Sequence, residues 1–395
     1  MIFNRTLSSK LIKEIDTPEI VVLTGMRRTG KTTLMNQVFE QVESKNKLYL
    51  DLENPLNQKI FEEVNYDNIW HNLDKFGIDN TAKTFLFLDE VQVFPPIVKA
   101  VKYLFDHYSV KFFLTGSSSF YLKNLFSESL AGRKVVYELF PLNFSEFLMF
   151  KDKKVGKQAE LDFSALAEKK NSLAFELNKG LYEEYLFFGG FPGVVVEKDR
   201  ERKKVLLEDI FKSYFEKDVK NLSNFKDLSK LRDLLLLLAK RTGSKVDISK
   251  ISSEIGVSRE TVYNYLSFLE KTYFIFLVSP FSLNTDREVS GARKVYFCDT
   301  GILNYLGVND EGVIFENAVF RELSRHGKVN YYQKRKGAEI DFILNEEIGF
   351  EVKLKPDFRD LKRLGKTASP LGLKDYFLIS RDYTGTKNTI LGVDL

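Results

Sequence analysis

The 395-residue sequence contains very little cysteine and histidine. Cys298 is its single cysteine, which excludes an intrachain disulfide and a zinc cage built from thiolates. The three histidines, His71, His107 and His326, are scattered along the chain and argue against a histidine-rich metal centre. Disulfide-stabilised scaffolds and cysteine-based zinc domains are therefore poor explanations of this chain.

Long apolar runs are also missing. No run approaches the roughly 20 residues that a helix needs to cross a bilayer. The opening letters, MIFNRTLSSKLIKEID, include acidic residues and no long apolar stretch, which is not the pattern of a secretory signal. We therefore expect no membrane segment and a cytoplasmic protein.

Neither sign of charge dominates, because 59 Lys and Arg residues face 55 Asp and Glu residues. The resulting net charge of +4 is compatible with a nucleic-acid partner but does not indicate one by itself. Hydrophobic residues make up 44% and charged residues 29%, which is typical of a globular protein and excludes a disordered or collagen-like chain. The length exceeds what one ordinary core holds, so we expect two or three domains.

Short apolar segments alternate with helix-compatible stretches in the first part of the chain. The segments are rich in residues that favour strands and lie at 20–23, 47–50, 84–88 and 111–114, with a fifth candidate at 134–139. Apolar strands that alternate with helices indicate a parallel sheet covered on both faces. After the fifth segment, Asn143 is placed to cap a helix together with Glu146. We expect an α/β domain over residues 1–150.

The rest of the chain predicts three further parts. Residues 151–221 are mostly helical and charged, and the letters FFGGFPG mark a sharp break between helices. Residues 222–291 contain an apolar helix, two helices separated by a turn at Gly256 and an apolar strand, an order typical of a winged helix-turn-helix. Residues 292–395 mix one helix, at 315–325, with several strands and predict a second kind of α/β domain.

The most specific motif is the glycine-rich loop at 25–33, which reads GMRRTGKTT. Its spacing, G-x-x-x-x-G-K-T, lets backbone N–H groups and the start of a helix point at phosphate oxygens. Lys31 adds a positive charge at the β- and γ-phosphates, and the Thr32 hydroxyl ligates magnesium. Arg27 and Arg28 either contact the phosphates or face solvent. The residues assigned to nucleotide binding are Gly25, Arg28, Thr29, Gly30, Lys31, Thr32 and Thr33.

A second element supports this assignment, because the apolar segment TFLFL is followed directly by two carboxylates. Asp89 is placed to hold magnesium, and Glu90 is placed to orient or deprotonate an attacking water. A water-handling carboxylate favours ATP hydrolysis over transfer of the phosphoryl group to a small acceptor. Lys31 and Glu90 are therefore the first two candidate catalytic residues.

With these two motifs, residues 1–150 resemble the AAA-type ATPases of the P-loop superfamily. The resemblance implies that the strand FFLTG lies between the two motif-bearing strands. It also implies that Thr115 or Ser117 senses the γ-phosphate, with Ser117 the preferred candidate; an ordinary helix cap at Ser117 is the alternative. Arg133 resembles the arginine that such ATPases contribute to the nucleotide of a neighbouring subunit, which requires a homo-oligomer, and a solvated surface arginine is the alternative.

Carboxylates interrupt two apolar strands near the C-terminus. Asp341 lies in AEIDFIL, and Glu351 and Lys353 lie on one face of GFEVKL. If residues 345–347 form a three-residue hairpin loop, Asp341 lies opposite Glu351, with Cβ atoms roughly 4.5–5.5 Å apart. Such carboxylates repel each other unless a cation lies between them. With a third oxygen from Glu316, they predict a magnesium site at which Lys353 steadies a water or a phosphate.

The pattern Glu…Asp…Glu-x-Lys resembles the PD-(D/E)xK nuclease superfamily, although Ile340 stands where that name has proline. The resemblance implies that Asp341 and Glu351 are metal ligands, that Lys353 is catalytic and that Glu316 is the helix carboxylate. Two strands with charged outer faces are the alternative explanation. With LNFSEF, GGFPG and EIDFIL, the whole chain resembles a bacterial and archaeal family that joins an AAA-type ATPase domain to a C-terminal domain of unknown function, which carries a winged helix and a nuclease-like fold.

Polar residues gather at the start of the second helix of the predicted helix-turn-helix. A DNA-reading helix places its base or phosphate contacts there, and the residues concerned are Ser258, Arg259, Thr261, Tyr263 and Asn264. Nearby glutamates dilute the positive charge of the nearby lysines. Contact with DNA and a protein-docking role therefore both remain open.

Two hypotheses of function follow. The first is a magnesium-dependent, ATP-hydrolysing AAA-type protein that acts on DNA through a nuclease-like C-terminal domain gated by ATP. The second is a signalling or scaffold ATPase whose C-terminal domain only binds a partner. The acidic triad separates them: if Glu316 and Asp341 do not lie within a metal's reach of Glu351, the binding-module hypothesis is favoured.

Overall fold

The computed structural model describes residues 5–116, 130, 132–153, 162–220, 225, 227–282, 291–334 and 337–395. The chain divides into two units. Unit 1 comprises Met1–Phe140, Ser213–Ser223 and Lys271–Tyr273, and unit 2 comprises Pro141–Lys212, Asn224–Glu270 and Phe274–Leu395. None of the described helices is both long enough and apolar enough to cross a bilayer. The domain limits predicted at 150, 221 and 291 stay predictions.

Unit 1 is built around a parallel sheet. Its described strands are β1 Ile20–Thr24, β2 Lys47–Asp51, β3 Thr84–Asp89, β4 Val110–Gly116 and β5 Lys134–Glu138. Their order is β2-β3-β4-β1-β5, and neighbouring strands pair in parallel. The strands predicted from the apolar segments are confirmed, and so is the placement of β4 between β3 and β1. The carboxyl ends of all these strands consequently meet at one edge of the sheet.

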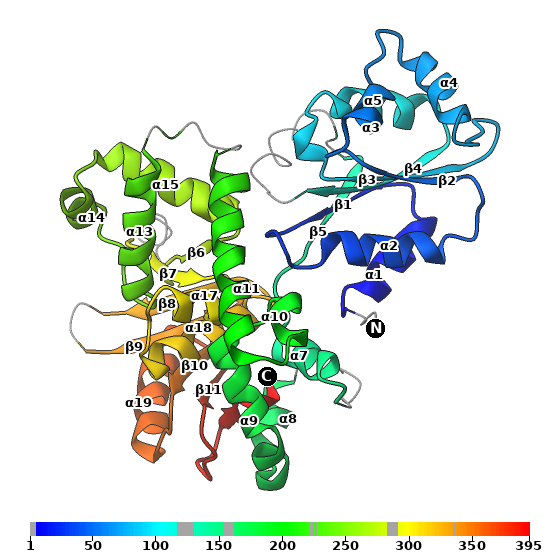
Figure 1. Cartoon of the computed structure of the whole chain (residues 1–395). Helices are drawn as coiled ribbons and strands as arrows, with labels where there is room; N and C mark the ends of the chain where they lie inside the picture. The colour runs from blue at the N-terminus through cyan, green and yellow to red at the C-terminus, as the bar shows by residue number, and fades with distance from the viewer. Residues whose placement is uncertain are drawn as a thin grey trace. The chain divides into compact units, whose positions relative to one another are not determined.

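Helices cover both faces of this sheet (Figure 1). One face carries α1 Ser8–Lys13 and α2 Lys31–Gln41, and the other carries α3 Pro55–Lys59, α4 Ile69–Asp74 and α5 Ile97–His107. Alternate residues of β1 enter two different cores: Ile20 and Val22 pack with side chains of α4 and α5, whereas Val21 and Leu23 pack with those of α1 and α2. Burial of both faces explains why the strand is apolar at every position.

Two short segments from later in the chain also belong to unit 1. The first contains a π-helix, Tyr214–Val219, and the second is Lys271–Tyr273. The Tyr214 and Thr272 hydroxyls share a 2.7 Å hydrogen bond, and the Tyr273 hydroxyl donates to Glu138 at 2.8 Å. These contacts attach both segments to the sheet domain, which nothing in their sequences had indicated.

The first half of unit 2 is helical. Its described helices are α7 Phe144–Phe150, α8 Phe163–Glu168, α9 Ser172–Phe188, α10 Pro192–Val196 and α11 Arg200–Ser213. The capping box predicted before α7 is confirmed, because the Asn143 side chain and Glu146 each bond the other's backbone N–H.

The break at FFGGFPG, between α9 and α10, is confirmed as well. Gly189 has φ 76°, and a Cβ on it would lie 1.9 Å from an oxygen of Asp299. A Cβ on Gly190 would lie 2.2 Å from the carbonyl oxygen of Leu142. The Gly190 N–H donates to Asp299 at 2.7 Å. This close approach of backbone to backbone and to a buried carboxylate explains the paired glycines, so the motif is accounted for by folding.

The middle of unit 2 contains the expected helices and strand, together with a second strand, β7 Lys294–Phe297, that was not predicted. The elements are α13 Leu228–Lys240, α14 Ile248–Ile255, α15 Arg259–Lys271, β6 Ile275–Val278 and β7 Lys294–Phe297. Gly256 ends α14 with φ 68°, and the Ser258 hydroxyl accepts from Thr261 N–H at the start of α15. Strands β6 and β7 pair antiparallel. The order of elements is as predicted, and its identification as a winged helix stays a prediction.

The C-terminal part of unit 2 is a mixed sheet with flanking helices. Its described strands are β8 Val329–Gln333, β9 Glu339–Leu344, β10 Ile348–Lys353, β11 Asp375–Ser380 and β12 Thr389–Leu391, in the order β12-β11-β10-β9-β8. Its helices are α17 Thr300–Tyr305, α18 Glu311–Leu323 and α19 Phe358–Ala368. The β8–β9–β10 pairs are antiparallel, whereas β10–β11 and β11–β12 are parallel.

Two details of this part differ from the sequence prediction, and one is confirmed. The helix expected at 315–325 is α18, which begins at Glu311 because the Asp310 side chain caps it by accepting from Gly312 and Val313. Helices α17 and α19 and strand β12 were not predicted. The three-residue hairpin loop is confirmed, because Leu344 lies opposite Ile348.

Candidate functional site

The glycine-rich loop joins the end of β1 to the start of α2. Gly25 has φ 147°, and a Cβ on it would lie 2.1 Å from the carbonyl oxygen of Leu139. Arg28 and Gly30 also have positive φ, at 63° and 96°. The loop therefore curls tightly, in a conformation that only glycine tolerates at position 25. Gly30 is the N-cap of α2 and has no side chain to occupy the N–H groups of the first helical turn.

Lys31 is the first residue of α2 and is 5% exposed. Its ammonium donates to the carbonyl oxygens of Gly25 at 2.8 Å and Met26 at 3.0 Å. Burial lowers the pKa of Lys31 below its ordinary value, although the nearby carboxylates of Glu90 and Asp218 oppose the shift. A buried ammonium inside a loop of carbonyl groups is a strong candidate to bind an anion.

Other side chains hold the loop in shape. The Thr29 hydroxyl donates to Met26 O at 2.8 Å, and Arg5 donates to Thr29 O at 2.9 Å and to Phe140 O at 2.8 Å. Thr32 and Thr33 are exposed on the first turn of α2. The side chains predicted to contact the nucleotide therefore form two sets. Thr29 and Lys31 are buried, whereas Arg28, Thr32 and Thr33 are exposed.

Asp89 ends β3 and is 3% exposed. The Thr115 hydroxyl donates to its Oδ1, and the Tyr49 hydroxyl donates to its Oδ2 at 2.8 Å. Burial and the charge of Asp89 raise the pKa of Tyr49, so this phenol remains a donor. Asp89 is thus fixed from the two strands that flank β3, which orients its oxygens at the strand's carboxyl end.

Glu90 follows Asp89 in the left-handed conformation, with φ 55°. Its N–H donates to the Thr115 hydroxyl at 3.0 Å and to Asp89 Oδ1 at 3.1 Å. The Gln92 amide donates to Glu90 Oε2. A non-glycine residue in this conformation is strained, and the two hydrogen bonds of its N–H help to hold it there.

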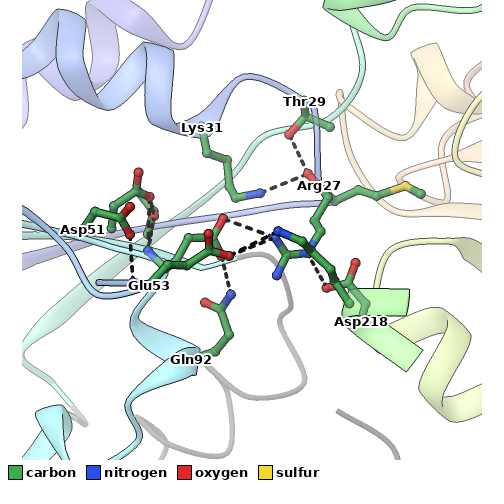
Figure 2. Close-up of polar contacts among 12 residues, drawn as sticks. Arg27, Thr29, Lys31, Asp51, Glu53, Gln92 and Asp218 are labelled. Atoms are coloured by element: carbon green, nitrogen blue, oxygen red, sulfur yellow. Dashed lines mark hydrogen bonds and ion pairs between the residues drawn. The ribbon is translucent and has the colours of Figure 1, made fainter. Parts of the chain in front are cut away.

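Arg27 lies at the centre of an acidic group (Figure 2). Its Nε donates to Asp218 Oδ1 at 3.0 Å, and its Nη1 lies 3.7 Å from Glu53 Oε1 and 3.9 Å from Glu90 Oε1. Burial alone would favour the neutral form, but the charges of Asp218, Glu90 and Glu53 outweigh it and raise the pKa of Arg27. Of the two loop arginines that the sequence left open, Arg27 faces the carboxylates and Arg28 is exposed.

Two further predicted residues are Ser117 and Arg133. Ser117 lies outside the described residues. Arg133 directly precedes β5, at the amino end of the sheet, whereas the loop follows the carboxyl end of β1, which is paired in register with β5. Arg133 forms an ion pair with Asp106 at 2.8 Å and is 38% exposed. Its assignment to a neighbouring subunit's nucleotide stays a prediction.

The C-terminal carboxylates lie where the hairpin register places them, each with protein partners. Phe350 lies opposite Phe342, so Glu351 and Asp341 are the next positions along β10 and β9. Asp341 accepts the Val352 N–H at 2.8 Å. Glu351 forms ion pairs at 3.1 Å with Lys353 and with Arg363 of α19. Burial and the charges of Glu316 and Glu351 raise the pKa of Asp341 well above its ordinary value.

Glu316 of α18 faces the same cluster. It accepts the Tyr296 hydroxyl at 2.7 Å, and burial raises the pKa of Glu316 in spite of the nearby Lys294. Across the described parts of the chain, no three Asp, Glu, His or Cys side chains gather as a group that could hold a metal ion. The metal-ligand roles of Glu316, Asp341 and Glu351 stay predictions.

The predicted DNA-reading residues lie at the surface of α15. Ser258, Arg259, Tyr263 and Asn264 are exposed, whereas Thr261 is half-buried. Glu254, which dilutes the positive charge of this region, forms an ion pair with Arg241 at 2.6 Å. An exposed aromatic ring and polar groups at the start of a helix suit contact with a nucleic acid or with a protein.

Comparisons with known proteins identify the relatives of this chain. Residues 17–148 match an AAA domain, residues 179–312 match a domain of unknown function (DUF8612), and residues 311–384 match a second domain of unknown function (DUF4143). The chain is 33% identical over 390 residues to the uncharacterized protein MJ1544 of Methanocaldococcus jannaschii, which covers 94% of this chain and 83% of MJ1544. The chain belongs to the same family as MJ1544.

A second relative of the MJ1544 family is an uncharacterized protein of Haemophilus influenzae, 28% identical over 373 residues, covering 89% of this chain and 88% of that protein. Among solved structures, the Walker-type ATPase PABY2304 of Pyrococcus abyssi is similar with a TM-score of 0.48 and 15% identity, covering 78% of this chain and 96% of that one. The AAA domain match confirms the AAA-type assignment of the first part of the chain. The nuclease-like resemblance of the last part stays a prediction.

The sequence analysis did not single out four side chains that contact the loop or the carboxylates after β3: Arg5, Tyr49, Gln92 and Asp218. Thr115 was named as the second choice for a sensor, and the structure shows it bonded to Asp89. Gln92 lies only two residues after Glu90, so its closeness to the predicted site could have been noted from the sequence. Tyr49 and Asp218 carry no local signal, because their role appears only once distant segments pair.

The lowered pKa of Lys31 predicts proton uptake when a nucleotide binds. In the free protein, burial favours neutral Lys31, whereas phosphate oxygens favour the ammonium and raise its pKa. Between the two pKa values the bound form holds more protons, so affinity falls as pH rises. Titration calorimetry over an ascending series of pH values, in two buffers of different ionisation enthalpy, should show no net proton uptake at low pH and net uptake that appears as the pH rises.

Lys31→Arg is the control, because a guanidinium stays protonated at these pH values. Any binding that this variant retains should proceed without proton uptake. Equal uptake in the variant and the wild type, or no uptake in the wild type, would contradict the assignment of the buried ammonium as the phosphate ligand.

Proposed function

We propose that unit 1 binds ATP together with magnesium and hydrolyses it. The observation that carries the proposal is the meeting of Lys31, Asp89 and Glu90 at one edge of the parallel sheet, beside a loop that curls at Gly25. Lys31 is buried, and the Asp89 carboxylate is held in one orientation by the Tyr49 and Thr115 hydroxyls. The AAA domain match over residues 17–148 supports the same function.

The chemistry of the loop fits a triphosphate. Lys31 donates to two loop carbonyls, and phosphate oxygens are acceptors that can replace them. The amino end of α2 adds N–H groups and a positive partial charge, since its N-cap is Gly30. Gly25 keeps backbone where a side chain would clash. The loop therefore offers several donors to one anion, which is what phosphate binding requires.

The fit to magnesium rests on oxygen ligands. Asp89 supplies a carboxylate whose direction is set by Tyr49 and Thr115, and Thr32 supplies an exposed hydroxyl on the first turn of α2. Hydroxyl and carboxylate oxygens are ligands that magnesium prefers, together with phosphate oxygens and water. When bound, the metal ion neutralises negative charge on the phosphates during transfer.

The remaining groups divide the work of hydrolysis. Lys31 holds the β- and γ-phosphates, and Arg28 and Thr33 lie at the exposed mouth of the loop, where the nucleotide would enter. Glu90 orients the attacking water and accepts its proton, as the carboxylate after the strand does in the proposed class. Arg27 and Gln92 hold the Glu90 carboxylate from either side.

For the C-terminal domain, the contacts favour the partner-binding hypothesis over cleavage of DNA. Glu351 is neutralised by Lys353 and Arg363, so metal binding would require these ion pairs to separate. Glu316 accepts the Tyr296 hydroxyl and Asp341 accepts the Val352 N–H, so both carboxyl groups already have partners within the protein. The exposed start of α15 offers a surface for that partner, and DNA is one candidate.

The ATPase proposal predicts different effects for two substitutions. Lys31→Ala removes the positive charge that binds the phosphates and should abolish both ATP binding and turnover. Glu90→Gln keeps the loop and should retain binding while lowering kcat by roughly two to four orders of magnitude. Phosphate release and binding of a fluorescent ATP analogue measure the two effects.

Lys99→Ala is the matched control, because Lys99 is an exposed lysine on α5. Its turnover should equal that of the wild type. Wild-type rates that persist in both Lys31→Ala and Glu90→Gln would remove the ATPase proposal.

The C-terminal hypothesis is tested with plasmid and branched DNA in magnesium or manganese. Because Glu351 is already ion-paired with Lys353 and Arg363, we expect the wild type and Asp341→Ala to give the same background, independent of metal. Metal-dependent cleavage by the wild type that Asp341→Ala loses would instead establish the nuclease hypothesis.

A further inference from the structure

Arg27 is tied to a residue that lies far away in the sequence. Its Nε donates to Asp218 Oδ1 at 3.0 Å, across a separation of 191 positions. Asp218 belongs to the π-helix Tyr214–Val219, and its side chain is 2% exposed. Helices of this kind are rare and are often found at functional sites. Asp218 therefore combines a buried carboxylate, a rare type of helix and a direct contact with the phosphate loop, which together indicate a functional role.

The other end of the Arg27 guanidinium faces Glu90. Nη1 lies 3.9 Å from Glu90 Oε1, while the Gln92 amide donates to Glu90 Oε2. The carboxylate assigned to the attacking water is therefore approached on both oxygens. The Gln92 contact comes from a residue only two positions along the chain. The contact with Arg27 depends on where the guanidinium of Arg27 is held.

Among the three carboxylates around Arg27, Asp218 is the one that fixes its position. The Asp218 contact is a charge-assisted hydrogen bond, whereas Glu53 and Glu90 lie at ion-pair distances of 3.7 and 3.9 Å. Asp218 is also the most buried of them, and Glu53 is 43% exposed. Without the charge of Asp218, the guanidinium would be free to move toward Glu53 or onto Glu90.

We propose that Asp218 is a positioning residue for ATP hydrolysis, which acts through Arg27 to orient Glu90. The inference rests on the proposed function, because it assumes that Glu90 handles the attacking water. It makes turnover depend on the π-helix Tyr214–Val219. A shift of this helix would reach Glu90 through two side-chain contacts, from Asp218 to Arg27 and from Arg27 to Glu90.

The test compares Asp218→Asn with Glu216→Gln. Both remove one negative charge from the same π-helix, but Glu216 is exposed. Asp218→Asn should lower kcat about tenfold to a hundredfold, while KM for ATP and the affinity for a fluorescent ATP analogue stay within about twofold. Glu216→Gln should keep the wild-type kcat. A loss of affinity with unchanged kcat would overturn the proposal, because Asp218 would then serve binding.

A double-mutant cycle tests whether the effect passes through Arg27. In an Arg27→Gln background, Asp218→Asn should lower kcat no further, since the group that it positions is already gone. An undiminished loss in that background would overturn the relay. Should Asp218→Asn fail to fold, Arg27→Lys replaces it: this variant keeps the charge and loses the forked geometry, and kcat should fall while KM holds. An unchanged kcat in Arg27→Lys would overturn the proposal.

These outcomes stay separate from the failure of the proposed function. If the wild type binds no nucleotide, the analogue titration shows it directly and the ATPase proposal fails. If the wild type binds and hydrolyses ATP and Asp218→Asn turns over at the wild-type rate, only the positioning role fails.

Discussion

The parallel register of β1, β3 and β4 is the constraint on which the rest of unit 1 depends. Thr24 of β1 lies opposite Gly116 of β4, and Leu88 of β3 lies opposite Leu114. The strands therefore end together, so the phosphate loop, Asp89 and Thr115 meet at one edge. The hydrogen bond from the Thr115 hydroxyl to Asp89 joins two of these strand ends directly. A shift of one residue between β3 and β4 would turn either side chain to the other face of the sheet and break this contact.

Two cations and two carboxylates lie at that edge, and each of the four has different partners. Lys31 is buried among carbonyl groups, and Arg27 is held by a buried carboxylate. Asp89 is bonded by two hydroxyls, whereas Glu90 lies between an amide and a guanidinium. Two neighbouring carboxylates with such different partners can take different roles, one as a metal ligand and the other at the attacking water. This division follows from packing, because each partner comes from a different strand or segment.

The sequence predicted those features whose signal is local. The phosphate loop, the acidic end of β3 and the hairpin that aligns Asp341 with Glu351 each depend on fixed spacings within a few residues. The contact of Glu351 with Arg363 was not predicted, because Arg363 belongs to α19, a helix that the sequence analysis did not identify. The pair of Arg27 and Asp218 could not be predicted, since no local pattern relates residues so far apart. Their contact requires that a short segment between two parts of unit 2 fold with unit 1.

The central claim is that the loop at 25–33 and Asp89 together bind magnesium and ATP. The most direct measurement is titration calorimetry of the wild-type chain with ATP, first with magnesium and then with a chelator. The account predicts saturable binding of one ATP per chain, weakened when the metal is removed, because Asp89 and Thr32 then lose the ion that they share with the phosphates. The absence of binding under both conditions would contradict the account.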